Sequence, residues 1–129
     1  MTTRYLLDTG IAGVYLNNDP SVRRRLKGSV FYISVIVAGE LYHGAFNSTN
    51  RQHNLEALRH FLAPWTLFPC DESTAECFGL IATQLKRHGY NIPHNDIWIA
   101  AQAIQYSLTL LTRDPKHMSM IDGLIWEQW

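Results

Sequence analysis

Residues 95–114 read NDIWIAAQAIQYSLTLLTRD, and this stretch decides the fold. Its first part follows the turn formers Pro93, His94 and Asn95 and predicts a helix that ends near Tyr106. Its second part predicts a short strand at residues 109–112. An acid lies in the first turn of the helix, and another acid, Asp114, closes the strand. A helix that leads directly into a strand is the repeating unit of an α/β fold.

The rest of the chain repeats this alternation. Strands are expected at residues 4–7, 30–33, 65–68 and, as a short fifth, 124–126. Helices are expected at residues 11–16, 20–27, 35–46, 51–62 and 72–88. This order predicts an α/β fold that is doubly wound, with a mainly parallel four- or five-stranded sheet and helices on both faces. Residues 1–129 have the size of a single domain.

The composition excludes several classes of protein. Hydrophobic residues make up 47% and charged residues 17%, which is typical of a globular protein and not of a disordered one. The N-terminus lacks the apolar core of a signal peptide, and no apolar run is long enough for a membrane span, so a cytoplasmic protein with no membrane partner is expected. Cys70 and Cys77 have the spacing of neither a disulfide framework nor a zinc site. No nucleotide-binding glycine loop is present, and no organic cofactor is predicted.

Four carboxylates lie in or beside apolar stretches, where ionised side chains are normally excluded. Asp8 and Asp114 each follow a predicted strand, and parallel strands end at the same edge of a sheet. Glu40 lies in the helix that begins at this edge after the second strand. Asp96 opens the helix that runs back to the fourth strand, so its first turn lies near the same edge. The sequence therefore predicts that all four acids meet there, in the crevice where doubly wound folds bind ligands.

Four clustered carboxylates repel one another and raise each other's pKa, and a divalent cation relieves this repulsion. Oxygen ligands without His or Cys at matching spacing favour Mg²⁺ or Mn²⁺. Such ions activate water for the hydrolysis of phosphodiesters. Setting these acids aside leaves seven acidic against eleven basic residues, so we expect an acidic hole in a mildly basic surround.

These residues resemble the four acidic motifs of the PIN domain, in order and over essentially the whole chain. The motifs are YLLDT (residues 5–9), SVIVAGEL (34–41), NDIWIAAQA (95–103) and LTRDPKHM (111–118). More narrowly, the chain is similar to the VapC toxins of bacterial VapBC toxin–antitoxin pairs, which are metal-dependent ribonucleases.

This resemblance implies a PIN-like fold, an RNA substrate, and a catalytic Mg²⁺ or Mn²⁺ site formed by the four acids, with Asp8 and Asp96 as the most direct ligands. It implies that Thr9 and Asn95 orient these ligands and that Thr112 lends a hydroxyl nearby. It also implies a cognate VapB-like antitoxin, and homodimers or toxin–antitoxin hetero-oligomers.

One departure touches the site, because Gly10 stands where the family usually has Asn or Ser. Either a polar contact is missing or a backbone amide supplies it.

Two alternatives to an active ribonuclease follow. The first is a catalytically weak PIN-like module that binds a partner protein. The second is a receiver-like phosphoacceptor domain, which needs paired acids after its first strand, whereas Thr9 and Gly10 follow Asp8 here. The basic run at residues 23–27 is more typical of a solvated helix face than of an RNA contact.

Overall fold

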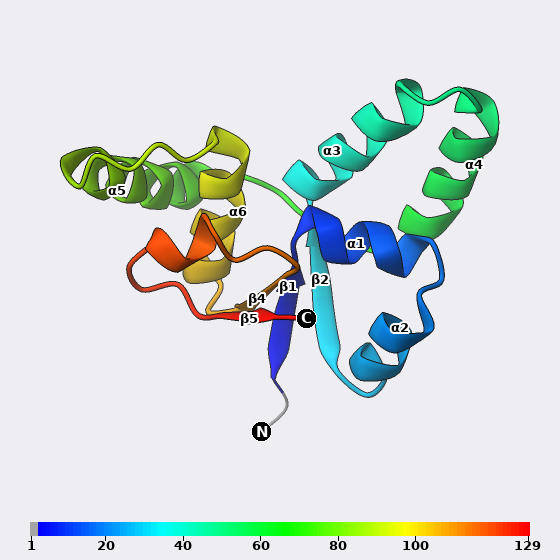
Figure 1. Cartoon of the computed structure of the whole chain (residues 1–129), viewed down its shortest axis with the longest axis horizontal. Helices are drawn as coiled ribbons and strands as arrows, with labels where there is room; N and C mark the ends of the chain where they lie inside the picture. Colours follow the sequence, from blue (N-terminus) through cyan, green and yellow to red (C-terminus); the bar gives the residue numbers. More distant parts are fainter. Residues whose placement is uncertain (1–2) are drawn as a thin grey trace.

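The structure is a computed structural model, and it describes residues 3–129. Strands and helices alternate along the chain, as predicted (Figure 1). The elements are β1 (Arg4–Leu7), α1 (Thr9–Leu16), α2 (Pro20–Leu26), β2 (Val30–Ser34), α3 (Val35–Phe46), α4 (Arg51–Leu62), β3 (Leu67–Phe68), α5 (Glu72–Arg87), α6 (His94–Gln105), β4 (Thr109–Thr112), the 3₁₀ turn η1 (Met118–Met120) and β5 (Trp126–Gln128).

The strands form one parallel sheet of five strands in the order β3-β2-β1-β4-β5. The chain steps in one direction from β1 to β3 and then returns past β1 to β4 and β5. Because crossovers between parallel strands are right-handed, the two directions place their helices on opposite faces. Figure 1 shows α1 to α4 on one side of the strands and α5 and α6 on the other. The predicted doubly wound fold is confirmed, and the strand order reverses between β1 and β4.

The second strand extends one residue beyond its predicted end, to Ser34, and two strands differ more from their predicted bounds. The third strand is shorter than residues 65–68, because the N–H of Trp65 donates to Leu62 O and continues the turn that ends α4. The fifth strand covers residues 126–128 instead of 124–126, because its register pairs Thr112 with Gln128. All of β5 is exposed. The prediction from the apolar residues at 124–126 was therefore wrong, because an exposed strand is not marked by apolar residues.

The centre of the sheet is buried on both faces. Leu6 and Leu7 of β1 and Leu110 and Leu111 of β4 are all 0% exposed, as expected for parallel strands covered by helices. Ser34 is equally buried, and its Oγ accepts the N–H of Ile36 at 2.9 Å, which caps α3 at the end of β2. This cap fixes the direction in which α3 leaves the sheet, and with it the position of Glu40.

Gln102 fixes α6 against the sheet. Its side chain is 0% exposed, and Nε2 donates to the carbonyl oxygens of Phe68 and Pro69, both at 3.0 Å. A buried amide that lost these partners would cost about 1–3 kcal/mol. The helix that carries Asp96 is therefore held at the end of β3.

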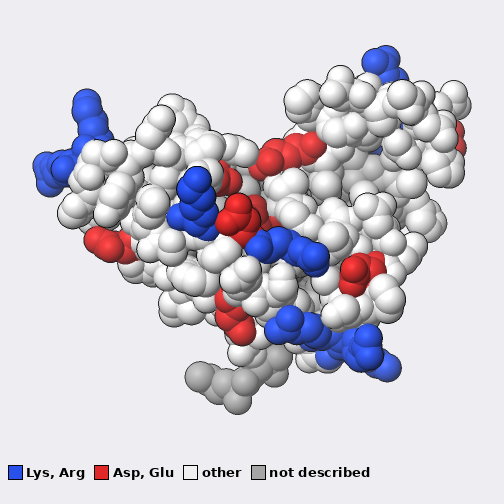
Figure 2. Space-filling model, viewed as in Figure 1, with Lys and Arg blue, Asp and Glu red and all other residues white. Residues whose placement is uncertain are grey.

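Two pairs of helices extend beyond the carboxyl ends of the strands. α3 packs with α4, and α5 packs with α6. Figure 1 shows one pair on each side, and Figure 2 shows that the molecular surface is hollowed between them. Within residues 3–129, no helix is both long and apolar enough to cross a membrane. Cys70 and Cys77 carry free thiols.

Candidate active site

Asp8 lies where β1 ends and α1 begins, at the predicted edge of the sheet. Its side chain caps α1, because Oδ1 accepts the N–H of Thr9 at 2.8 Å. Its other oxygen, Oδ2, accepts the hydroxyl of Thr112 at 3.0 Å. Thr112 is the last residue of β4. The carboxylate is therefore oriented by one hydrogen bond from the start of α1 and one from the end of β4.

Thr112 joins Asp8 to the segment that contains Asp114. The Thr112 side chain is 1% exposed, and its Oγ1 accepts the backbone N–H of Asp114 at 3.2 Å. The carboxylate of Asp114 accepts the N–H of Lys116 at 3.2 Å. Asp114 is the one exposed member of the four predicted acids, since the other three are half-buried. The structure thus brings the Asp114 backbone to the site and leaves its carboxylate at the rim.

Glu40 and Asp96 bring further negative charge to Asp8. Burial raises the pKa of the Asp8 carboxyl, and the charges of Asp96 and Glu40 raise it further, while the hydrogen bonds from Thr9 and Thr112 oppose this. Neighbouring carboxylates shift a pKa in this way only when they are close. Glu40 from α3 and Asp96 from α6 therefore act electrostatically on Asp8 at the end of β1, whereas the strand order predicted a cluster of all four acids.

Two buried oxygen atoms of this region, Glu40 Oε1 and Thr9 Oγ1, have no hydrogen-bond partner within residues 3–129. A buried polar atom without a partner costs about 1–3 kcal/mol. Carboxylate and hydroxyl oxygens suit hard cations such as Mg²⁺ and Mn²⁺, so these donors fit a divalent ion. The cluster is not a finished cage, because the described residues contain no group of three His, Cys, Asp or Glu side chains already arranged around one point.

Asp96 has a partner that the sequence did not reveal. His117 Nδ1 lies 2.7 Å from Asp96 Oδ2, and the two side chains are 36% and 20% exposed. His117 directly precedes η1, whose first residue, Met118, is 1% exposed and anchors the loop in the core. His117 lies within the fourth motif, at residues 111–118, but a contact across 21 residues leaves no periodic signal.

The two residues that precede Asp96 at the start of α6 are placed differently. Asn95 is half-buried, and its side chain makes no hydrogen bond to any of the described residues. The ring of His94 lies edge-on to that of Phe78 in α5, with centroids 5.7 Å apart. The sequence leaves open whether a backbone amide replaces the polar side chain that is missing at Gly10. In the structure, the backbone N–H that donates to Asp8 belongs to Thr9.

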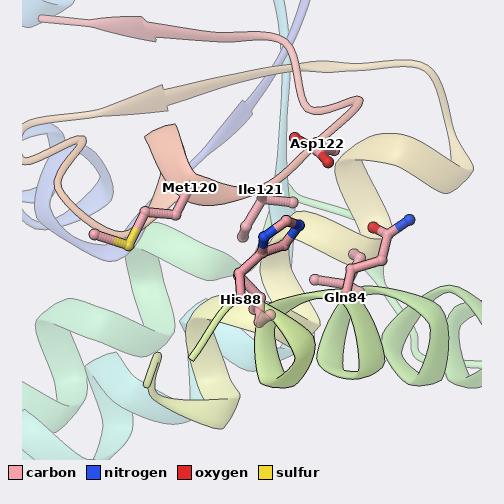
Figure 3. A pocket seen from close by; sticks show the side chains of 7 residues that line it. Gln84, His88, Met120, Ile121 and Asp122 are labelled. Atoms are coloured by element: carbon pink, nitrogen blue, oxygen red, sulfur yellow. The ribbon is translucent and has the colours of Figure 1, made fainter. Parts of the chain in front are cut away.

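Figure 2 shows acidic side chains gathered in the hollow between the two helix pairs, with basic side chains directly beside them. This is the acidic hole that the charge distribution predicts. A separate small pocket lies between the end of α5 and η1 and is lined by Gln84, His88, Met120 and Asp122 among others (Figure 3). Its volume of about 10 Å³ holds at most one water molecule, and none of the four predicted acids lines it.

Comparison with known proteins places these features in a family. The model of the PIN domain family matches residues 5–123. Ribonuclease VapC2 of Rickettsia felis is 31% identical over 130 residues, covering 97% of each chain. The tRNA(fMet)-specific endonuclease VapC of Shigella flexneri is 30% identical and covers 98% of each chain.

A solved structure is equally similar. The crystal structure of VapBC2 from Rickettsia felis, bound to a DNA fragment from its promoter, superposes with a TM-score of 0.90. The two chains are 30% identical, and the match covers 98% of this chain and 99% of that one. The similarity therefore includes both the fold and the sequence that carries the acidic motifs.

Proposed function

The chain belongs to the PIN-domain family and, within it, to the VapC ribonuclease toxins of toxin–antitoxin systems, and we propose that it hydrolyses RNA phosphodiester bonds with the help of Mg²⁺ or Mn²⁺. The observation that carries the metal dependence is the cluster of Asp8, Glu40 and Asp96, in which burial and mutual repulsion raise the pKa of Asp8. A divalent cation relieves that repulsion. The same family membership removes the receiver-like alternative.

We assign the ion to Asp8, Glu40 and Asp96, with the exposed carboxylate of Asp114 completing the set from the rim. When bound, such an ion supplies Lewis acidity for activating water and for stabilising the leaving oxygen. The protein keeps the ligands in one orientation, because the Thr9 N–H and the Thr112 hydroxyl hold Asp8. His117 holds Asp96 in the same manner. Outer-shell hydrogen bonds of this kind tune how tightly a metal site binds its ion.

We also propose that the chain acts as one domain in the cytoplasm and pairs with a VapB-like antitoxin. Relatives from Rickettsia felis and Salmonella typhimurium were crystallised as VapBC complexes.

The direct test is RNA cleavage by the purified chain with Mn²⁺, with Mg²⁺ and with EDTA. We expect cleavage with either ion and none with EDTA. Asp8→Asn and Asp96→Asn should each lower the rate by more than about 100-fold, which exceeds the usual loss of an outer-shell partner. Asp122→Asn is the matched control, since Asp122 is an exposed acid beside the separate pocket.

Two outcomes would contradict the proposal. Full activity of both Asp8→Asn and Asp96→Asn would show that these acids do not carry the reaction. A wild-type chain that binds an antitoxin but cuts no RNA with any divalent ion would identify it as the weakly catalytic binding module.

Expression in bacteria, followed by mapping of new RNA ends, identifies the substrate. Initiator tRNA is the first RNA to examine, because the Shigella flexneri relative is a tRNA(fMet)-specific endonuclease.

A further inference from the structure

Gly10 and Arg113 lie against each other at the rim of the acidic cluster. A Cβ atom added at position 10 would lie 3.4 Å from Arg113 Cγ and 3.6 Å from Arg113 Cβ. These are ordinary van der Waals distances, so an alanine would just fill the gap. A longer side chain at position 10 would need the space that the stem of Arg113 occupies. Gly10 therefore leaves Arg113 room to cross the start of α1.

The backbone of Arg113 is held on both sides. The preceding residue, Thr112, is hydrogen-bonded to Asp8, and the following residue, Asp114, donates its N–H to Thr112. The carbonyl oxygen of Arg113 itself accepts the side-chain amide of Gln128 at 3.3 Å. The arginine is thus tied to the same strand end that orients the predicted metal ligand, and only its side chain is free to move.

The guanidinium of Arg113 has no partner among the described residues. Its side chain is exposed, and within residues 3–129 it makes neither a hydrogen bond nor an ion pair. An arginine next to a cluster of carboxylates would normally pair with one of them. An unpaired guanidinium in this position keeps its donors available for a ligand that is itself anionic.

We propose that Arg113 binds a phosphate group of the RNA next to the cleaved bond, and that Gly10 leaves the space for it. The inference rests on the proposed ribonuclease function. An RNA phosphate that approaches the cluster meets the negative charge of Asp8, Glu40 and Asp96, and a planar guanidinium at the rim offsets this repulsion. Arginine suits this role because its paired N–H groups match two phosphate oxygens. Basic side chains are visible directly beside the acids in Figure 2.

The test compares charge-matched variants of the full chain. Arg113→Gln removes the positive charge at the rim. Arg59→Gln is its control, because Arg59 is exposed in the last turn of α4 and makes no side-chain hydrogen bond to the described residues. Gly10→Asn displaces the arginine stem, whereas Gly10→Ala adds only a methyl group at van der Waals distance from it, so the two variants grade the steric effect. Arg113→Lys restores the charge without the planar fork.

The first readout is cleavage in Mn²⁺. Arg113→Gln should raise the KM for RNA roughly 10-fold with a smaller change in kcat, as expected for loss of one charged hydrogen-bonded contact. Gly10→Asn should reproduce most of this rise, and the double variant should add little to either single change, because both act on the same contact. Gly10→Ala should raise the KM less than Gly10→Asn does, and Arg59→Gln should resemble the wild-type chain.

The second readout is binding of a fluorescent single-stranded RNA in EDTA at several salt concentrations. Loss of one phosphate contact should reduce the slope of log affinity against log salt by about 0.7 for Arg113→Gln, and by nothing for Arg59→Gln. Equal slopes and equal KM values for these two variants would overturn the proposal, as would fully additive effects of Gly10→Asn and Arg113→Gln. If the wild-type chain bound RNA through Arg113 but never cut it, the ribonuclease proposal would be wrong, whereas the proposed contact between Arg113 and RNA would be supported.

Discussion

His117 Nδ1 lies 2.7 Å from Asp96 Oδ2, so the loop before η1 holds the acid that opens α6. We expect His117→Ala to weaken Mn²⁺ binding by about 10- to 100-fold, because outer-shell partners fix the orientation of metal ligands. His117→Asn, which can still donate a hydrogen bond, should recover part of this loss. Titration of the protein with Mn²⁺, followed by electron paramagnetic resonance, measures the affinity directly. Equal affinity in all three proteins would contradict this role.

Thr112→Val should lower both stability and activity. The substitution preserves the shape of a side chain that is 1% exposed, but it removes the hydroxyl that donates to Asp8 and accepts the N–H of Asp114. We expect a loss of about 1–3 kcal/mol in the free energy of unfolding, measured in urea. Thr112→Ser keeps the hydroxyl and should retain most of the cleavage rate. A valine variant as active as the serine variant would show that this hydrogen bond does not orient Asp8.

Asp8→Asn should stabilise the metal-free protein at neutral pH, although it abolishes cleavage. Burial and the neighbouring acids raise the pKa of Asp8 in the folded state above its ordinary value of 3.8. The folded protein therefore holds this proton more tightly than the unfolded chain does. This favourable contribution is complete below the unfolded pKa and is lost as the pH rises through the folded pKa.

The pH dependence provides the check on this prediction. In EDTA, the melting temperature of Asp8→Asn should exceed that of the wild type by a few degrees at neutral pH, and the difference should vanish as the solution becomes acidic. A difference that stayed constant with pH would point to altered packing instead of altered charge.

Divalent ions should raise the free energy of unfolding, and the increase should grow with the ratio of the ion concentration to its dissociation constant. An ion at about 100 times its dissociation constant adds about 2.7 kcal/mol to the free energy of unfolding, which raises the melting temperature by several degrees. Differential scanning fluorimetry with Mg²⁺ or Mn²⁺ measures this shift. Asp96→Asn should lose it and Asp122→Asn should keep it. The same shift in both variants would mean that the ion binds elsewhere.

Much of the site could be predicted because its main determinants are local. Short apolar runs at residues 4–7 and 109–112 predict central strands, and an acid directly after each one must lie at the sheet edge. Glu40 follows from the serine cap that starts its helix at the same edge. These steps require only strand order and helix direction, and they place Asp8, Glu40 and Asp96 at one edge, where the charges of Glu40 and Asp96 raise the pKa of Asp8.

The remaining features depend on side-chain directions that no periodic pattern encodes. The strand position predicted that Asp114 meets the other acids at the sheet edge, but a turn to Lys116 leaves its carboxylate exposed. The contact of His117 with Asp96 and that of Arg113 with Gly10 depend on how one loop folds over α1 and α6. The last strand was misplaced because an exposed edge strand lacks the apolar alternation that marks a buried one.

The hydrogen bond between Thr112 and Asp8 joins residues that are 104 positions apart in the chain. A ribosome adds about 5–20 residues per second, so roughly 5–20 seconds separate the synthesis of the two ends of this bond. β1 can pair with β2 early in that interval, whereas β4 arrives only at its close. A nascent chain thus has no assembled site until Thr112 has been added, and it can acquire the capacity to cut RNA only after that point.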